Sequence, residues 1–156
     1  MGKLTIISGG QAGVDRAAMD VALKRGIPCA GWCPEGRLAE DGIIDEKYPL
    51  KETGSEDPNV RTRMNVDGSD GTVVIHLGQI DAGTAFTITT CVTSGKPLLE
   101  VDLSERYNIG HILNWLKEKK LEKINVAGPR ESYIPGIYDA SVRLLEPLLR
   151  DLSKKE

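Results

Sequence analysis

The chain has 156 residues, enough for one domain of ordinary size with a sizeable core. Its formal net charge is -3, whereas a nucleic-acid-binding surface is normally strongly basic, so we expect no nucleic-acid partner. It contains no run of about 18 apolar residues and its start leads directly into a strand pattern, so we expect no membrane segment and a cytoplasmic protein.

Residues 4–16, LTIISGGQAGVDR, combine an apolar run, a glycine-rich turn and the start of a helical pattern. The run predicts a buried strand, and the helix that follows directs its first free N–H groups toward whatever lies above the turn. This layout is typical of an anion or nucleotide site, with the backbone of residues 9–13 close to the ligand. The spacing GGxxG is neither the dinucleotide pattern nor the P-loop, so the ligand class stays open, and a plain turn is the alternative.

The chain continues as alternating helices and strands. The spacing of Val14, Ala17, Ala18 and Val21 predicts a helix that ends near Gly26. The other predicted strands cover residues 27–32, 72–77, 98–101 and 123–127, and the other predicted helices cover residues 58–66, 83–94, 109–120 and 138–152. We expect Pro147 to kink or split the last helix.

Residues 34–70 lose this periodicity and form a long excursion. A connection of this length inside a small domain is usually functional, and a solvated flap is the alternative.

This alternation predicts one α/β domain over residues 1–156, a single doubly wound, mainly parallel five-stranded sheet with helices on both faces. If the strand order is 2-1-3-4-5, the first and third strands are neighbours, and the loops at Gly9–Gly10 and Gly83–Thr84 meet at one crevice. The fifth strand would then be an edge strand, and Arg130 would reach the crevice only if its loop folds inward.

Groups that bind an oxyanion gather near this crevice. They are the N–H groups of both loops, the hydroxyls of Thr84 and Thr87, and the guanidinium of Arg16. Thr84 is equally well explained as an ordinary helix N-cap.

Three further candidates lie farther along the chain. Trp32 could stack on a flat ring or fill the core, while Arg37 and Asp41 could close over the ligand or form a solvated ion pair. The candidate ligand-binding residues are Gly9, Gly10, Gln11, Ala12, Gly13, Arg16, Trp32, Arg37, Asp41, Gly83, Thr84, Thr87 and Arg130.

The sequence offers little for catalysis. It has no GxSxG elbow, no histidine in a predicted loop and no cysteine beside a candidate base. Asp15, in the first turn of a helix, is best explained as a partner of the helix dipole. The carboxylates that could act as general acids or bases are Glu35, Glu40, Asp41, Asp81 and Glu131, and nothing selects among them.

The cysteines suggest neither disulfides nor a metal site. Cys29, Cys33 and Cys91 are an odd number in a chain with no secretory signal. The Cys29–Cys33 spacing could hold a metal, but no second Cys or His pair accompanies it, because His76 falls in a strand pattern and His111 in a helix pattern.

Four sequence blocks resemble the putative molybdenum carrier family. In order, they are SGGQAGVDRAAMDVAL, GIPCAGWCPEGRLAEDG, RTRMNVDGSDGTVV and NVAGPRESYIPGIYDAS, and together they span nearly the whole chain. That family is similar to molybdenum cofactor carrier proteins and belongs to a Rossmann-like group that includes the nucleotide phosphoribohydrolases often called lysine-decarboxylase-like. The resemblance implies a Rossmann-like fold, a homo-oligomer, and binding of the molybdenum cofactor (molybdopterin) or a related nucleotide.

One departure separates the chain from those hydrolases. They carry PGGxGTxxE, whose glutamate assists cleavage of the glycosidic bond, whereas here Gly83-Thr84 is retained and Thr87 replaces the glutamate. A hydroxyl cannot do the work of that carboxylate. This favours a non-catalytic binder of a small phosphorylated ligand, and the alternative is an enzyme that cleaves the N-glycosidic bond of a nucleoside 5′-monophosphate.

Overall fold

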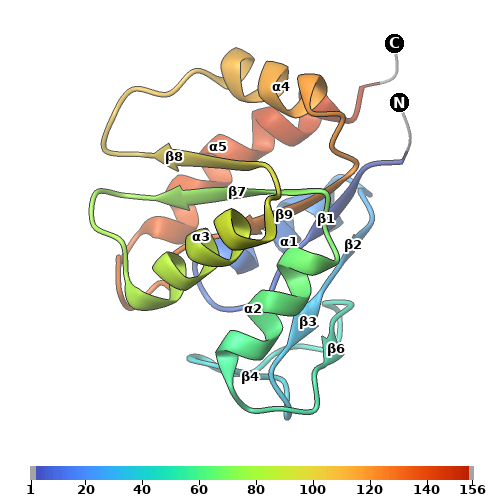
Figure 1. Cartoon of the computed structure of the whole chain (residues 1–156), viewed down its shortest axis with the longest axis vertical. Coiled ribbons are helices and arrows are strands. Elements are labelled where there is room, and N and C mark those ends of the chain that lie inside the picture. The colour runs from blue at the N-terminus through green and yellow to red at the C-terminus, as the bar shows by residue number, and fades with distance from the viewer. Residues whose placement is uncertain (1–2, 155–156) are drawn as a thin grey trace.

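A five-stranded parallel sheet forms the central layer of the structure, a computed structural model that describes residues 3–154 (Figure 1). Every strand pairing within this sheet is parallel. In spatial order the strands are β2 (Cys29–Ala30), β1 (Thr5–Ile7), β9 (Lys123–Ala127), β7 (Gly71–His76) and β8 (Leu98–Asp102). All six residues of β7 are buried, as expected for a strand that is covered on both faces.

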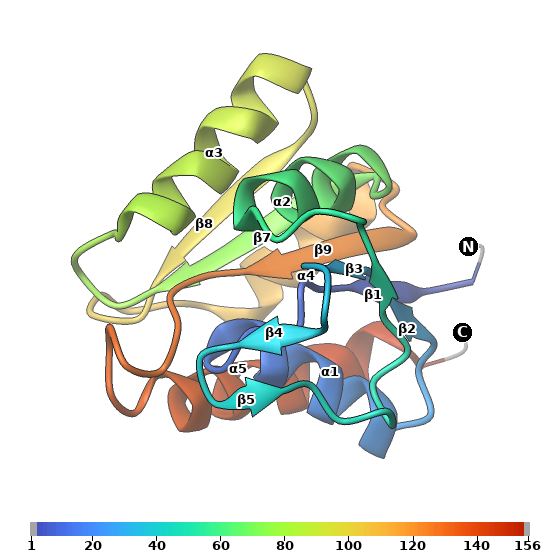
Figure 2. The ribbon, with the colours of Figure 1, turned by 90° about the horizontal axis from the view of Figure 1, so that it is seen from below.

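Helices cover both faces of the sheet (Figure 2). On one face α1 (Val14–Lys24) packs along α5 (Ile137–Leu152), which also contacts α4 (Ile109–Glu118). On the other face α2 (Pro58–Asp67) packs against α3 (Ala82–Ser94). Crossovers between parallel strands are right-handed, so the face that a helix covers depends on whether the chain moves to the next strand in one direction along the sheet or in the other. The predicted doubly wound α/β fold is therefore confirmed.

The predicted helix periodicity places the core correctly. Val14, Ala17, Ala18 and Val21 are buried in one cluster between the sheet and α5. Helix α5 runs without a break through Pro147, so the prediction that it splits there is wrong. Buried leucines on both sides of the proline hold the helix in place despite the hydrogen bond that proline cannot donate. None of the helices within residues 3–154 has the length and hydropathy needed to cross a bilayer.

The predicted strand order is wrong. Numbered along the chain as predicted, the five strands lie in the order 2-1-5-3-4, because β9 inserts between β1 and β7. Ile6 of β1 pairs with Ile124, and Val73 of β7 pairs with Val126. The central position suits β9 because its middle residues are buried, whereas the edge strand β8 exposes Glu100.

The predicted strand over residues 27–32 is two short strands. Gly31 separates β2 from β3 (Trp32–Cys33), which leaves the main sheet and pairs with β6 (Lys51–Glu52). A Cβ at Gly31 would lie 1.9 Å from the carbonyl oxygen of Ser8, and φ there is +152°. The chain turns out of the sheet at the point where only glycine fits.

The excursion is ordered by one arginine. The guanidinium of Arg37 donates hydrogen bonds to the carbonyl oxygens of Ile44, Asp45, Tyr48 and Leu50, with nitrogen–oxygen distances of 2.8–3.1 Å. A hairpin of β4 (Leu38–Ala39) and β5 (Gly42–Ile43) projects beside it. These hydrogen bonds hold together the part of the excursion before α2, whose regular structure is limited to the short strands β4, β5 and β6.

We predict that Gly128→Ala destabilises the fold by roughly 3 kcal/mol, because overpacking against backbone cannot be relieved by a side-chain movement. A Cβ at Gly128 would lie 2.1 Å from the carbonyl oxygen of Ile75 in β7. Urea unfolding measures the change. The matched control is Gly83→Ala, where the nearest atom would be 3.4 Å away, and it should cost less than about 1 kcal/mol. Equal losses in the two variants would contradict the prediction.

Candidate functional site

A polar cavity of about 280 Å³ lies at the carboxyl ends of β1, β9 and β7, beside α2. This is the edge of an open parallel sheet at which such folds bind ligands. Its walls come from four segments: Gly9, Gln11 and Asp15 after β1; Pro58, Asn59, Arg61, Thr62 and Asn65 on α2; Asp81, Gly83, Thr84 and Thr87 at the start of α3; and Asn125, Ala127, Gly128 and Arg130 at the end of β9.

The two predicted glycine loops line the same cavity although their strands are not neighbours. The loop after β9 lies between them and completes the wall. Its contacts to the first loop are backbone hydrogen bonds from Glu131 N–H to the Ala12 carbonyl and from Val14 N–H to the Pro129 carbonyl. A Cβ at Gly13 would lie 2.5 Å from the Pro129 carbonyl oxygen, so this glycine serves loop packing.

The structure brings about half of the predicted site residues together. Those that line the cavity are Gly9, Gln11, Gly83, Thr84, Thr87 and Arg130. Those that do not are Gly10, Ala12, Gly13, Arg16, Trp32, Arg37 and Asp41. Contact of the first group with a ligand remains a prediction.

The residues outside the cavity have structural partners. Arg16 makes a bidentate pair with Asp41, at 3.0 and 3.1 Å, and donates to the carbonyl of Gly10. Trp32 lines a separate cavity of about 150 Å³ on the other side of α2. A Cβ at Gly10, where φ is +75°, would lie 2.4 Å from Leu50 Cδ1, so packing alone requires glycine at this position.

Two charged residues that are not among the predicted ligand-binding residues, Arg61 and Asp15, face the cavity. Arg61 donates from Nη1 to the carbonyl oxygen of Gly9 at 3.1 Å, and the same nitrogen lies 4.0 Å from Asp15 Oδ2. The two side chains are only 14% and 10% exposed. A Cβ at Gly9 would lie 2.7 Å from Arg61 Nη1, so the glycine makes room for the guanidinium.

The start of α3 presents free backbone donors to the cavity. The first helical hydrogen bond runs from Ala85 N–H to the Asp81 carbonyl, so the N–H groups before it have no partner within the helix. The carboxylate of Asp81 accepts from the Thr84 hydroxyl and does not cap the backbone. Thr87 donates to the Gly83 carbonyl at 3.2 Å. The positive end of the helix dipole is therefore open to an anion.

Burial raises the pKa of Asp15 from 3.8 to about 6, although the nearby Arg61 and Arg16 act in the opposite direction. A carboxyl group with this pKa changes its charge close to neutral pH. Carboxyl groups with a strongly shifted pKa are common at functional sites. Burying a charge lowers the stability of the fold, so a buried carboxyl group often serves binding or catalysis.

Most of the other candidate carboxylates lie outside the cavity. Glu40 accepts from Ser132 and lies 3.3 Å from Arg130, which ties the β4–β5 hairpin to the rim. Glu131 accepts from the N–H groups of Gly136 and Tyr138 at the start of α5. Among the five candidates only Asp81 lines the cavity.

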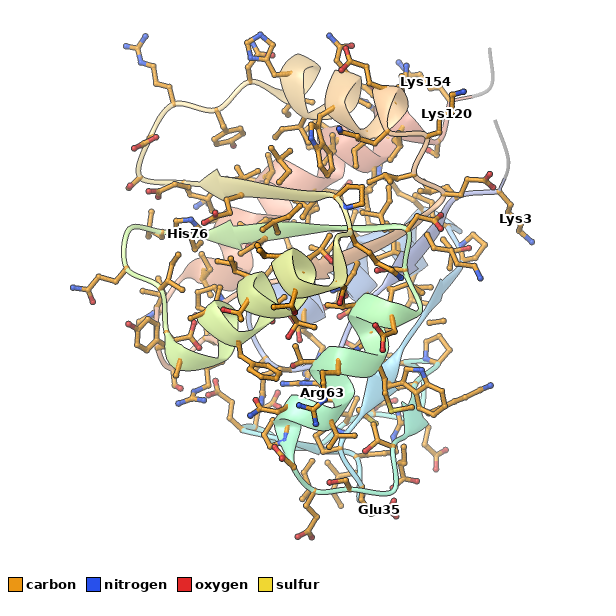
Figure 3. All side chains as sticks on the ribbon, in the orientation of Figure 1. Lys3, Glu35, Arg63, His76, Lys120 and Lys154 are labelled. Carbon is orange, nitrogen blue, oxygen red and sulfur yellow. The ribbon has the colours of Figure 1, made fainter. Side chains whose placement is uncertain are left out.

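Histidine and cysteine do not contribute to the cavity. His76, at the carboxyl end of β7 (Figure 3), has Nδ1 3.1 Å from the Gly78 carbonyl oxygen. None of the cysteines is a wall residue. Over residues 3–154, no three His, Cys, Asp or Glu side chains gather in a way that could hold a metal ion.

Comparisons with known proteins agree with the fold and the resemblance. Residues 6–149 match the model of the circularly permutated YpsA SLOG family. The crystal structure of a protein named putative molybdenum carrier protein, from Syntrophus aciditrophicus SB, is 42% identical, covers 94% of this chain and 95% of its own, and superposes with a TM-score of 0.89. No curated protein matches the chain. The predicted family resemblance is confirmed.

We predict that Asp15→Asn stabilises the protein at about pH 7.5 by about 2 to 3 kcal/mol, with little effect near pH 4. The raised pKa means that between about pH 4 and 6 the folded chain keeps a proton that the unfolded chain releases. Stability is therefore lost as the pH rises through this interval, and asparagine removes the loss. Urea unfolding at both pH values measures this.

The matched control is Asp139→Asn, because Asp139 is exposed and lies outside the cavity. It should change the free energy of unfolding by no more than about 0.5 kcal/mol at either pH. A loss of stability in Asp15→Asn at the higher pH would contradict the assignment.

Proposed function

The chain belongs to the circularly permutated YpsA SLOG family, and from that premise we propose that it is a non-catalytic carrier or sensor of a phosphorylated small molecule. The ligand is a nucleotide or a phosphorylated pterin, held in the cavity between the glycine loops. One observation carries the proposal: Arg61 and the open start of α3 face the same cavity.

Both features favour a phosphoryl group. The guanidinium of Arg61 is fixed by the Gly9 carbonyl and makes charge-assisted hydrogen bonds to an oxyanion. The N–H groups of Gly83 and Thr84 supply neutral donors from a helix start, a common phosphate-binding arrangement. The cavity volume of about 280 Å³ is at the small end for ligand sites, so it suits a phosphoryl group with its neighbouring atoms.

Molybdenum enters this proposal only as cargo. The printed name of the similar crystal structure mentions a molybdenum carrier. The cavity walls offer nitrogen and oxygen groups without a cysteine, so they supply no sulfur ligand to a metal ion. Their N–H and guanidinium donors suit the phosphate of a molybdenum cofactor.

A second candidate function is hydrolysis of the N-glycosidic bond of a nucleoside 5′-monophosphate. The observation in its favour is that two carboxyl groups, Asp15 and Asp81, line one cavity in different environments. In that reaction the water oxygen bonds to C1′ while the C1′–N bond breaks. Protonated Asp15 would donate to the leaving nitrogen, and Asp81 would accept the proton of the water.

These two functions predict different results with AMP. A hydrolase releases free adenine, which chromatography detects, and loses this activity in Asp15→Asn and Asp81→Asn. A binder gives no free base from AMP or from a panel of other nucleotides. Replacement of Glu40 or Asp41, which lie outside the cavity, should matter to neither.

We predict that a ligand of the proposed class raises the melting temperature of the purified protein by about 5 °C or more at one hundred times its Kd, since binding to the folded state adds about 2.7 kcal/mol. Native mass spectrometry with metal analysis of the purified protein identifies what it carries. The proposal fails if nucleotides, pterins and molybdate all leave the melting temperature unchanged.

We predict that Arg61→Gln weakens binding of that ligand by about 10- to 100-fold, because one hydrogen bond between charged groups is lost. Arg63→Gln is the matched control. Arg63 is exposed on the same helix (Figure 3), lies 5.6 Å from the Phe86 ring and is not a wall residue, so affinity should stay within about twofold.

A steric variant tests the same cavity from α3. Gly83→Val adds a branched side chain to the wall without forcing a strained φ, so it should abolish binding and leave the fold intact. Ala85→Val, at an exposed position of the same helix, should bind as the natural protein does. Isothermal titration calorimetry measures all four variants, and equal affinities within either pair would contradict this site.

A further inference from the structure

A carboxylate stands beside the donors proposed to hold the phosphoryl group. Asp15 Oδ2 lies 4.0 Å from Arg61 Nη1, too far for a direct hydrogen bond between them. Both groups are wall residues of the cavity, and a Cβ at Gly9 would touch both. An anion oxygen that accepts a hydrogen bond from Arg61 is therefore brought close to a second acidic group.

Few positive charges near Asp15 are left to offset an added dianion. Arg130 also lines the cavity, but its Nε lies 3.3 Å from Glu40 Oε1. On the helix that carries Asp15, Arg16 is turned to Asp41, with which it makes two hydrogen bonds. Asp15 also faces Arg61 on α2 and a second acidic residue, Asp81, in the loop before α3. Among the described residues that act on Asp15, one guanidinium is thus left to balance two carboxylates and the ligand.

We propose that Asp15 is a specificity-determining residue that shares a proton with the bound phosphoryl group, so that the cavity selects phosphate and phosphomonoesters over oxyanions that carry no proton. This inference rests on the proposed function and deepens it, because it names the property of the ligand that the cavity recognises.

The chemistry follows from matched acidities. A phosphomonoester has its second pKa near 6, and burial brings the pKa of Asp15 to about 6, so one proton is readily held between the two groups. Sulfate and molybdate carry no proton at neutral pH. Their oxygens and the Asp15 carboxylate can only accept hydrogen bonds, so no hydrogen bond forms between them and the two negative groups repel each other.

Calorimetry with inorganic phosphate, AMP, sulfate and molybdate at about pH 7 tests the proposal. We predict that phosphate and AMP bind the natural protein at least about tenfold more tightly than sulfate or molybdate. Repeating the titration in buffers with different ionisation enthalpies should show proton uptake when phosphate binds, a measurement that needs no variant.

Asp15→Asn supplies the second arm of this experiment. The amide can donate a hydrogen bond, so sulfate should bind this variant about tenfold more tightly than it binds the natural protein, and the preference for phosphate should fall toward equality. Asp139→Asn, which alters an exposed carboxylate outside the cavity, should keep the preference unchanged.

The outcomes separate this inference from the proposed function. Equal binding of phosphate and sulfate by the natural protein, or an unchanged preference in Asp15→Asn, overturns the inference while the binding function stands. If Asp15→Asn weakens binding of AMP but not of phosphate, Asp15 contacts the nucleoside part of the ligand and the inference is wrong. If no anion or nucleotide binds either protein, the proposed function itself fails.

Discussion

The cavity depends on two close backbone contacts, at Gly128 and Gly13, where there is no room for a side chain. At Gly128 the loop after β9 lies directly against the backbone of β7, and at Gly13 the loop after β1 lies directly against the loop after β9. A methyl group at either place would push the loops apart by more than side-chain movement can absorb. Of the glycines that first suggested close approach to a ligand, Gly13 serves the approach of one loop to another, whereas Gly9 makes room for Arg61 and Gly10 for Leu50.

The electrostatics of this cavity are unfavourable for folding. Asp15 and Arg61 are both largely withdrawn from water, yet the 4.0 Å between Asp15 Oδ2 and Arg61 Nη1 is too long for a hydrogen bond. A sequence selected for stability alone would replace such a pair with apolar side chains of similar volume. The arrangement makes sense if a ligand occupies the space beside them and completes their hydrogen bonding.

The sequence predicted the elements better than their arrangement. Periodicity placed β9 at residues 123–127 and the start of α1 at Val14, because local spacing decides both. The position of β9 in the sheet depends on which way the crossover through α4 runs, and no local pattern records this. The apolar run predicted a strand as far as Trp32, but β2 ends before Gly31. The cause is the close approach of Gly31 to the Ser8 carbonyl oxygen, which exists only in the folded chain. Asp15 was missed because a helix dipole explains it as well. Arg61 was missed because the helix predicted over residues 58–66 has no clear apolar face to indicate which side meets the sheet.

Arg37 has a further consequence for how this chain can vary. One guanidinium meets carbonyl oxygens at positions 44, 45, 48 and 50, which a strand or helix would otherwise have to satisfy. Backbone carbonyls are the same for every residue type, so these hydrogen bonds place no demand on the exposed side chains of Glu46 and Lys47. An insertion or deletion there would move the oxygens away from the guanidinium. The length of this segment is therefore fixed more tightly than the identities of its exposed residues.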